Sequence, residues 1–483
     1  MKQTIATISR LGRRHAFALL VLFVALGGSS VAAYAAATKL LPKNSVGSAQ
    51  VINGSLRKVD LSKKATAALR GPRGQQGAQG PAGPTGSAGP QGPKGETGVP
   101  GAPGQQGAQG SPGLPGLGAA RSSPGAARLT TLDSTGDAGS YTSATLGADG
   151  LGLISYYDAT AGDLKVAHCD NVACTSASKS TLDSAGDVGL YTSVTIGADG
   201  FGLISYFDFT NLDLKVVHCN NAACTSAGKS ILDTTGDVGA FSSVTLGADG
   251  RGLISYKDVT NGDLKVAHCA DTACTSASKN TLDTIGDVGA NTSATVGMDG
   301  RGLISYFDSS NANLKVAHCA DLACTSAFPT PSTLDSTGFV GSYSSVTIGT
   351  DGRGLISYYD MTMGDLKVAH CDDKACTTAS TSTLDSTGIV GLYTSATIGA
   401  DGLGLISYND FTNHALKVAR CVDTSCTTAS PSTLDGTNIV GLYTSATTGA
   451  DGFGLISYYD GTNHDLKVAH CSNTFCAPYF RRR

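Results

Sequence analysis

Residues 129–479 consist of one pattern of apolar and polar positions that is repeated seven times with a period of 50 residues and one two-residue insertion. The second copy contains four short runs that are apolar, alternating or β-branched, at residues 191–197, 202–207, 214–219 and 224–232. Turn-forming residues separate these runs, and no helical period appears. Each copy is therefore predicted to form four short strands. The copies begin at Thr131, Thr181, Ile231, Thr281, Thr333, Thr383 and Thr433.

Four-stranded units of about 40 to 50 residues that repeat in this way are typical of propeller blades. The predicted fold is all-β, a seven-bladed β-propeller. The first copy starts at Leu129-Thr130-Thr131-Leu132 without a preceding cysteine pair, and the last copy lacks the Thr-Leu-Asp strand that should follow Cys476. One blade is therefore expected to combine both ends of the domain, which closes a ring and covers its edges. A β-solenoid or another stacked array is the alternative.

The N-terminal 37 residues have the layout of a signal peptide. Arginines precede an apolar run at residues 16–26, and small residues follow it. Ala33-Tyr34-Ala35 and Ala35-Ala36-Ala37 are candidate cleavage sites. An uncleaved anchor is the alternative, since residues 16–37 contain few polar side chains and about 20 apolar residues can span a bilayer. In both cases everything after Thr38 is expected outside the cell.

Three further segments precede the repeats. Residues 38–70 form a basic arm with seven Lys or Arg residues and one acid, Asp60. From Gly71 to Gly116 glycine occupies every third position, sixteen times without a miss. Only glycine fits at the crowded axis of a triple helix, so residues 71–118 are predicted to form a collagen-like stalk and hence a homotrimer. Residues 119–128 are read as a linker, and residues 480–483 as a basic tail.

Short motifs in these segments resemble those of known proteins. Asn44-Ser45-Val46 and residues 51–56 resemble a segment found before collagen tracts in secreted actinobacterial proteins. Pro72-Arg73, residues 93–96 and Gly113-Leu114-Pro115 resemble triplets of bacterial collagen-like proteins. The resemblance implies a secreted, trimeric, collagen-like protein.

The fourteen cysteines form seven pairs with four residues between the members of each pair. This even, regular count predicts a disulfide in every blade and an oxidising compartment. A metal site made from such a pair and the histidine before it, as at His168, is the alternative, but zinc sites normally bring four ligands together. No metal and no cofactor are therefore predicted. The expected pairs are Cys169 with Cys174, Cys219 with Cys224, Cys269 with Cys274, Cys319 with Cys324, Cys371 with Cys376, Cys421 with Cys426, and Cys471 with Cys476.

Composition argues against several classes of function. Charged residues make up 15% of the chain, and the net charge is -4. The sequence has no basic patch interleaved with aromatic residues, so it gives no indication of a nucleic-acid partner. Aspartates such as Asp149 and Asp158 recur in every copy. A turn-forming aspartate is needed in every copy, whereas a catalytic group is needed only once, so these aspartates are interpreted as turn residues. Calcium bound at individual turns is an alternative, but no dense acidic loop is present.

Positions that differ between the copies are candidates for a ligand site. With strands in the usual propeller order, the turn before the first strand and the hairpin between the second and third share one face. An aromatic, asymmetric rim is expected there, and drift at exposed turns after duplication is the alternative explanation. The turn contributes Tyr141, Tyr191, Phe241, Asn291, Tyr343, Tyr393 and Tyr443. The hairpin contributes Tyr157, Phe207, Lys257, Phe307, Tyr359, Asn409 and Tyr459, with His414 and His464 nearby.

On the opposite face, Arg251, Arg301 and Arg353 occupy one column in three successive copies. An anionic polymer could dock on this basic arc, or the three arginines could simply be solvated.

Three functions follow as hypotheses. The first is an extracellular structural or adhesive protein, in which the stalk trimerises the heads and multiplies weak contacts with glycans or matrix proteins. The second is a lectin-like, carbohydrate-binding head. The third is a glycoside hydrolase of sialidase-like fold, which the chain resembles poorly because it has no Trp and almost no Glu to supply a carboxylate pair. The sequence therefore favours a protein that is not an enzyme.

Overall fold

The computed structural model describes residues 126–478, and within them every regular element is a β-strand. No helix long and apolar enough to cross a membrane occurs in this part of the chain. The predicted signal peptide, basic arm, Gly-X-Y tract, most of the linker and the basic tail lie outside the described residues.

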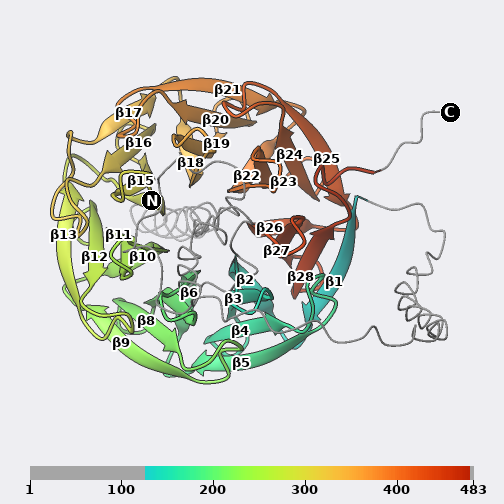
Figure 1. Cartoon of the computed structure of the whole chain (residues 1–483), viewed down its shortest axis with the longest axis horizontal. Helices are drawn as coiled ribbons and strands as arrows, with labels where there is room; N and C mark the ends of the chain where they lie inside the picture. Colours follow the sequence, from blue (N-terminus) through green and yellow to red (C-terminus); the bar gives the residue numbers. More distant parts are fainter. Residues whose placement is uncertain (1–125, 479–483) are drawn as a thin grey trace, which may run out of the picture. The chain divides into compact units, whose positions relative to one another are not determined.

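Twenty-eight strands form seven four-stranded antiparallel sheets arranged in a ring (Figure 1). The first strands of the blades, which contact one another around the ring, are β2 (Ala138–Leu146), β6 (Val188–Ile196), β10 (Val238–Leu246), β14 (Ala290–Val296), β18 (Val340–Ile348), β22 (Val390–Ile398) and β26 (Val440–Thr448). The second strands are β3 (Gly152–Asp158), β7 (Gly202–Asp208), β11 (Gly252–Asp258), β15 (Gly302–Asp308), β19 (Gly354–Asp360), β23 (Gly404–Asp410) and β27 (Gly454–Asp460).

The third strands are β4 (Asp163–Cys169), β8 (Asp213–Cys219), β12 (Asp263–Cys269), β16 (Asn313–His318), β20 (Asp365–Cys371), β24 (Ala415–Cys421) and β28 (Asp465–Cys471). The fourth and outermost strands are β5 (Ala177–Asp183), β9 (Ala227–Asp233), β13 (Ala277–Asp283), β17 (Ser332–Asp335), β21 (Ala379–Asp385), β25 (Ala429–Asp435) and β1 (Ala127–Asp133). The predicted fold is therefore confirmed.

The predicted closure of the ring is also confirmed. The seventh blade has the strand order β1-β28-β27-β26, so its outermost strand comes from the start of the domain. Ala127 lies opposite Cys471, and Thr130 lies opposite Val468. β1 begins at Ala127, two residues before the predicted start of the propeller. The fourth blade carries the two-residue insertion, and its outermost strand β17 is shortened to four residues.

The hydrophobic core lies between the blades. Leu153 and Val166 of the first blade pack against Val194 and Ile204 of the second, and equivalent clusters fill the other six interfaces. These side chains are fully buried, and each contributes roughly 1.5 to 3 kcal/mol when it is removed from water. Apolar residues on both faces of a strand explain why the runs in the sequence are continuous rather than strictly alternating.

Hydroxyl groups join the first strand of each blade to the first and second strands of the neighbouring blade. The backbone N–H of Val194 donates to Ser143 Oγ over 3.1 Å, and Thr192 Oγ1 donates to Ser155 Oγ over 2.9 Å. All four residues are buried. Small polar side chains on the inner strands therefore satisfy one another across the blade interfaces.

The loops form two ends of the propeller. At one end, which we call the hairpin face, the loop before each first strand meets the hairpin between the second and third strands: Asp137 N donates to Thr160 Oγ1 over 2.7 Å. At the other end, the disulfide face, the loop after the first strand meets the end of the third strand, next to the cysteine loop: His168 Nε2 lies 2.8 Å from Asp149 Oδ2. Ala126 and Cys471 lie at the disulfide face, where Ser472 N donates to Ala126 O. The described chain thus begins and ends at the disulfide face.

Candidate functional site

An aromatic collar occupies the centre of the ring. Its rings contact one another from blade to blade, with centroids 4.5 to 5.1 Å apart in the order Phe241, Tyr191, Tyr141, Tyr443, Tyr393 and Tyr343. Asn291 takes the seventh position, and its Oδ1 accepts a hydrogen bond from Tyr343 N over 3.1 Å. Because these contacts run around the ring through the innermost strands, the side chains point toward its axis.

The collar residues were predicted in an exposed turn, and the structure corrects that position. They lie within the first strands, and the side chains of Phe241 and Tyr343 are only 3% exposed. Burial raises the pKa of Tyr191 and of Tyr393 to about 12. Tyr141, Tyr191, Tyr393 and Tyr443 are partly buried. The collar is therefore a packed, partly exposed layer rather than a set of exposed turn residues.

A backbone irregularity turns these side chains inward. All seven collar residues have positive φ, such as 54° at Tyr141, and the strand register shifts at this point. A left-handed residue in a strand re-aims its side chain and costs on the order of 1 to 3 kcal/mol unless packing holds it. Gly139 lies two residues earlier, where an added Cβ would come within 2.7 Å of Leu466 Cα. Glycine at this place lets the neighbouring blade approach.

The second predicted column lies at the penultimate residue of each second strand and packs beneath the collar. Tyr157 and Tyr459 contact Tyr141 and Tyr443 with ring centroids 6.2 and 6.0 Å apart. Their hydroxyls donate to Asp187 over 2.6 Å and to Asp137 over 2.7 Å. The structure therefore brings aromatic members of the two predicted columns into contact. The remaining members are Phe207, Lys257, Phe307, Tyr359 and Asn409, with His464 beside Tyr459 and His414 on the neighbouring hairpin.

A further variable column, which sequence reasoning missed, lies on the hairpin face. Its members are Asp137, Asp187, Asp237, Asp287, Phe339, Ile389 and Ile439. The backbone N–H of each blade's member is held by the hairpin hydroxyl, for example Asp137 N by Thr160 and Phe339 N by Thr362 Oγ1 over 2.8 Å. The main chain is thus the same while the side chain changes from acidic in four successive blades to apolar in three. The change from acidic to apolar residues is visible when the seven copies are aligned, and this signal could have revealed the column from the sequence.

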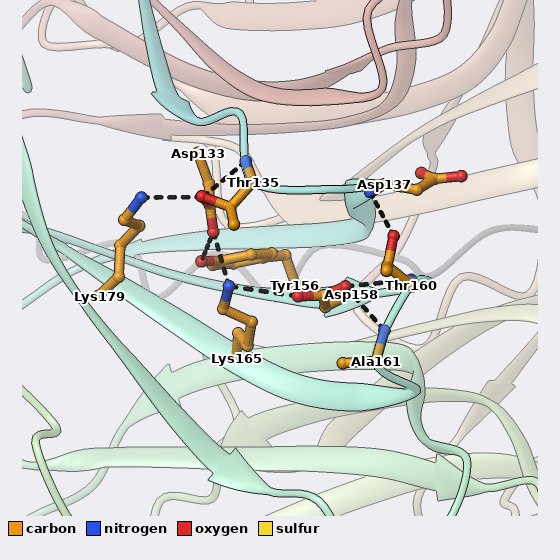
Figure 2. A network of polar contacts seen from close by, with 9 residues as sticks. All are labelled: Asp133, Thr135, Asp137, Tyr156, Asp158, Thr160, Ala161, Lys165 and Lys179. Atoms are coloured by element: carbon orange, nitrogen blue, oxygen red, sulfur yellow. Dashed lines mark hydrogen bonds and ion pairs between the residues drawn. The ribbon is translucent and has the colours of Figure 1, made fainter.

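A buried polar staple joins neighbouring blades, and Figure 2 shows the one at Asp133. The carboxylate of Asp133, at the end of β1, accepts hydrogen bonds from Tyr156 Oη, Lys165 Nζ and Lys179 Nζ of the first blade, each over 2.8 Å. Lys165 Nζ also lies 3.3 Å from Asp158 Oδ2 and 5.6 Å from the centre of the Tyr156 ring. The contacts of the tyrosine and the first lysine recur at Asp183, Asp233, Asp283, Asp335, Asp385 and Asp435. The second lysine recurs at Asp183, as Lys229, and at Asp233, as Lys279.

The staple keeps the carboxylate of Asp183 ionised. Burial alone raises the pKa of Asp183, but hydrogen bonds from Lys215, Lys229 and Tyr206 outweigh it and lower the pKa to about 2. Burial and the charge of Asp183 raise the pKa of Tyr206 far above its ordinary value. A carboxylate held in this way binds its own lysines and leaves no proton to exchange at neutral pH.

Seven disulfides pair the cysteines as the spacing predicts, and the described residues contain no free cysteine. The bridges join Cys169 to Cys174, Cys219 to Cys224, Cys269 to Cys274, Cys319 to Cys324, Cys371 to Cys376, Cys421 to Cys426, and Cys471 to Cys476. Both sulfurs of every pair are buried at the disulfide face. Seven bridges indicate an extracellular setting.

The second cysteine of each pair lies in the loop after the third strand, not at the start of the fourth strand as the sequence pattern suggested. These residues have positive φ, between 47° and 54°, which no strand residue adopts without a bulge. The backbone N–H of Cys224 donates to Asn221 O over 3.0 Å, so the loop is a tight turn. The residues corrected in this way are Cys174, Cys224, Cys274, Cys324, Cys376, Cys426 and Cys476.

The histidines before the bridges pair with loop aspartates, as His268 Nε2 does with Asp249 Oδ2 over 2.9 Å. No group of three or more potential metal ligands occurs between residues 126 and 478. The cysteine sulfurs are bonded to each other, so they are not available as thiolate ligands.

The repeated aspartates occupy turns, as expected. Asp158 Oδ1 accepts from Thr160 N and Ala161 N over 3.1 Å, and Asp149 Oδ1 accepts from Leu151 N over 3.0 Å. The arginine column also lies where it was predicted: Arg251 and Arg353 are exposed on the disulfide face.

Comparison with known proteins identifies the segment before the propeller. Residues 67–127 match the family model of the collagen triple helix repeat. No curated protein sequence matches the chain. Similar solved structures include a protein of unknown function from Dyadobacter fermentans (12% identity over 71% of this chain and 98% of that chain, TM-score 0.45) and an α-L-arabinofuranosidase of Fusarium graminearum (11%, 58% and 91%, TM-score 0.43). Puromycin hydrolase is also similar (12%, 71% and 56%, TM-score 0.44). The chain thus combines a segment that matches the collagen triple helix repeat with a seven-bladed, disulfide-linked β-propeller domain.

Proposed function

We propose that the protein is a secreted, non-catalytic head on a trimeric stalk, which serves a structural or adhesive role outside the cell. The observation that supports this most is the position of the chain connection. The polypeptide enters and leaves the propeller at the disulfide face, so the hairpin face with its variable column carries no connection. Three such faces on one stalk would add weak contacts into a stable attachment.

The chemistry of the head supports a non-catalytic role. The described residues contain no glutamate. Their repeated aspartates are held by turn N–H groups or by the lysines of the staples. A glycosidase needs two carboxylates that flank one bond and can exchange a proton.

Trimerisation tests the proposal directly. The purified full chain should sediment with three times the mass of one chain in high salt, because the Gly-X-Y tract requires three strands. Gly92→Asp, which places a side chain at the axis, should reduce this mass to that of one chain. Pro93→Ala, at the next position, serves as the matched control and should remain trimeric. A single-chain mass for the unaltered protein would overturn the head-on-stalk arrangement.

Adhesion is tested with the same two proteins. The trimeric chain should bind an immobilised glycan or matrix protein much more tightly than the single-chain variant Gly92→Asp does, because only the trimer gains from avidity. Equal binding by both would contradict the role proposed for the stalk.

A further inference from the structure

The net charge of the chain is small, but acidic and basic residues are concentrated in different segments. Residues 126–478 hold 36 of the 38 acidic residues but only 17 of the 34 basic residues, a formal net charge of -19. The basic arm, residues 38–70, holds seven basic residues against one acid, a formal net charge of +6. The propeller and the arm of one chain type therefore attract each other.

The hairpin face is also the apolar face of the propeller. Of the seventeen large hydrophobic side chains that are exposed between residues 126 and 478, ten lie in its loops. Phe209, Phe339 and Phe411 are each more than half exposed. Exposed apolar side chains that gather at one end of a domain are typical of surfaces that bind another chain. The ten are Phe209, Leu212, Val259, Ile285, Phe339, Met361, Met363, Ile389, Phe411 and Ile439.

In the variable column of this face, acidic side chains occupy four blades and apolar side chains the other three. Asp137 and Asp287 keep side-chain exposures of 38% and 53%, although each has a partner within the propeller. Across the ring, Phe339, Ile389 and Ile439 occupy the same backbone position. The matching partner therefore presents basic and apolar side chains together, rather than charge alone.

We propose that the hairpin face binds the basic arm, residues 38–70, of a second copy of this chain. The arm has the required chemistry. Arg57, Lys58, Lys63 and Lys64 alternate with Leu56, Val59 and Leu61 within nine residues. The lysines and arginines pair with the aspartates of the face, and the aliphatic side chains pack on its exposed apolar side chains.

The arm comes from a second molecule because of how the chain is connected. The assignment of the arm to a second molecule rests on the proposed head-on-stalk arrangement, and the rest of the inference does not. A triple helix of residues 71–118 would be a rod on the order of 150 Å long, and the chain enters the propeller through Ala127, at the face opposite the hairpins. Docking between copies then links molecules head to tail, a contact that does not close on itself.

The test compares assembly of the purified full chain in low and high salt, by sedimentation velocity. In low salt, about 50 mM NaCl, the protein should form species larger than its high-salt form, because screening weakens contacts between exposed charges. The arm variant Lys58→Glu/Lys63→Glu/Lys64→Glu and the face variant Ile389→Ser/Phe411→Ser should each associate at least tenfold more weakly. A synthetic peptide of residues 38–70, added in excess, should also inhibit assembly.

The matched control is Met298→Ser/Phe475→Ser, which removes two side chains that are 69% and 62% exposed on the disulfide face. It should assemble like the unaltered chain. Mixing the arm variant with the face variant should restore one kind of contact, because the intact hairpin face of the arm variant can bind the intact basic arm of the face variant. Loss of assembly in the control, or none restored on mixing, would overturn the proposal. The high-salt mass reports trimerisation separately, so failure of the stalk and failure of docking are distinguishable.

Discussion

The hydroxyl of Tyr206 donates a hydrogen bond to Asp183 Oδ2 over 2.8 Å, although the two residues belong to different blades. Asp183 ends the outermost strand of the first blade, and Tyr206 lies in the second strand of the next. Lys215 Nζ completes the contact at 2.6 Å from the same oxygen. Each staple therefore fixes one blade against its neighbour at a buried, charged point.

The two lysines of this staple should contribute unequally to stability. Lys215→Met leaves the buried carboxylate of Asp183 without its closest cation, which is expected to lower the free energy of unfolding by about 3 kcal/mol or more. Lys229, whose side chain is 46% exposed, is the matched control, and Lys229→Met should cost no more than about 1 kcal/mol. Denaturant titration measures both. Equal losses would show that the staple does not depend on the buried cation.

Stability should fall in acid. The pKa of Asp183 and that of Asp233 are lowered to about 2, so the stability they contribute is complete above about pH 4 and is lost as the pH falls toward 2. Burial raises the pKa of Asp163 and Asp213, which acts in the opposite sense and costs stability as the pH rises through their pKa. The free energy of unfolding should therefore be greatest between about pH 4 and 6. Denaturant titrations from pH 7 to pH 2 check this, and a profile that stays flat below pH 4 would contradict it.

Most tyrosines should resist ionisation. Fifteen of the seventeen have raised pKa values, chiefly through burial, and the other two lie outside the described residues. Ultraviolet absorption during an alkaline titration should report at most two phenols near pH 10, and the remainder only at higher pH or on unfolding. Because folded tyrosines stay protonated where unfolded ones ionise, stability is lost as the pH rises above about 10. Titration of many tyrosines at pH 10 in the folded protein would be inconsistent with a closed collar.

Each disulfide should make its own contribution to the free energy of unfolding. Closing a loop of this size contributes roughly 2 kcal/mol in the chain-entropy model. Cys224 has a φ of 51°, so the variant Cys219→Ala/Cys224→Gly removes the bridge and keeps a residue that accepts this backbone conformation. Its unfolding free energy should fall by about that amount. In the unaltered chain all cysteines should resist alkylation until the protein is denatured and reduced.

The fold could be predicted from the sequence because its information is local and repeated. Each strand of a blade follows the last by a short turn, and the missing cysteine pair before Leu129 revealed which blade takes β1. The spacing of Cys219 and Cys224 likewise implied their bridge. One boundary was placed early: the fourth strand was expected from Cys224, whereas β9 starts at Ala227, because Cys224 lies in the loop with positive φ.

The collar and the staples could not be predicted in the same way. Tyr141 follows Gly139 and was read as a turn residue, since nothing local shows that a left-handed residue inside a strand turns the ring to the axis. Asp133 meets partners 23 and 32 residues away in the next blade. Contacts between blades depend on how sheets pack, which the strand pattern alone does not specify. The binding role assigned to the two variable columns stays a prediction.

The pairing of β1 with β28 sets the order in which the molecule can be completed. β1 leaves the ribosome before every other strand of the propeller, and its backbone partner leaves after them all. Until that moment the growing sheet array exposes an unpaired edge at each end, the condition in which β-proteins aggregate. Synthesis that stops short of residues 465–471 therefore yields an open arc rather than a smaller propeller.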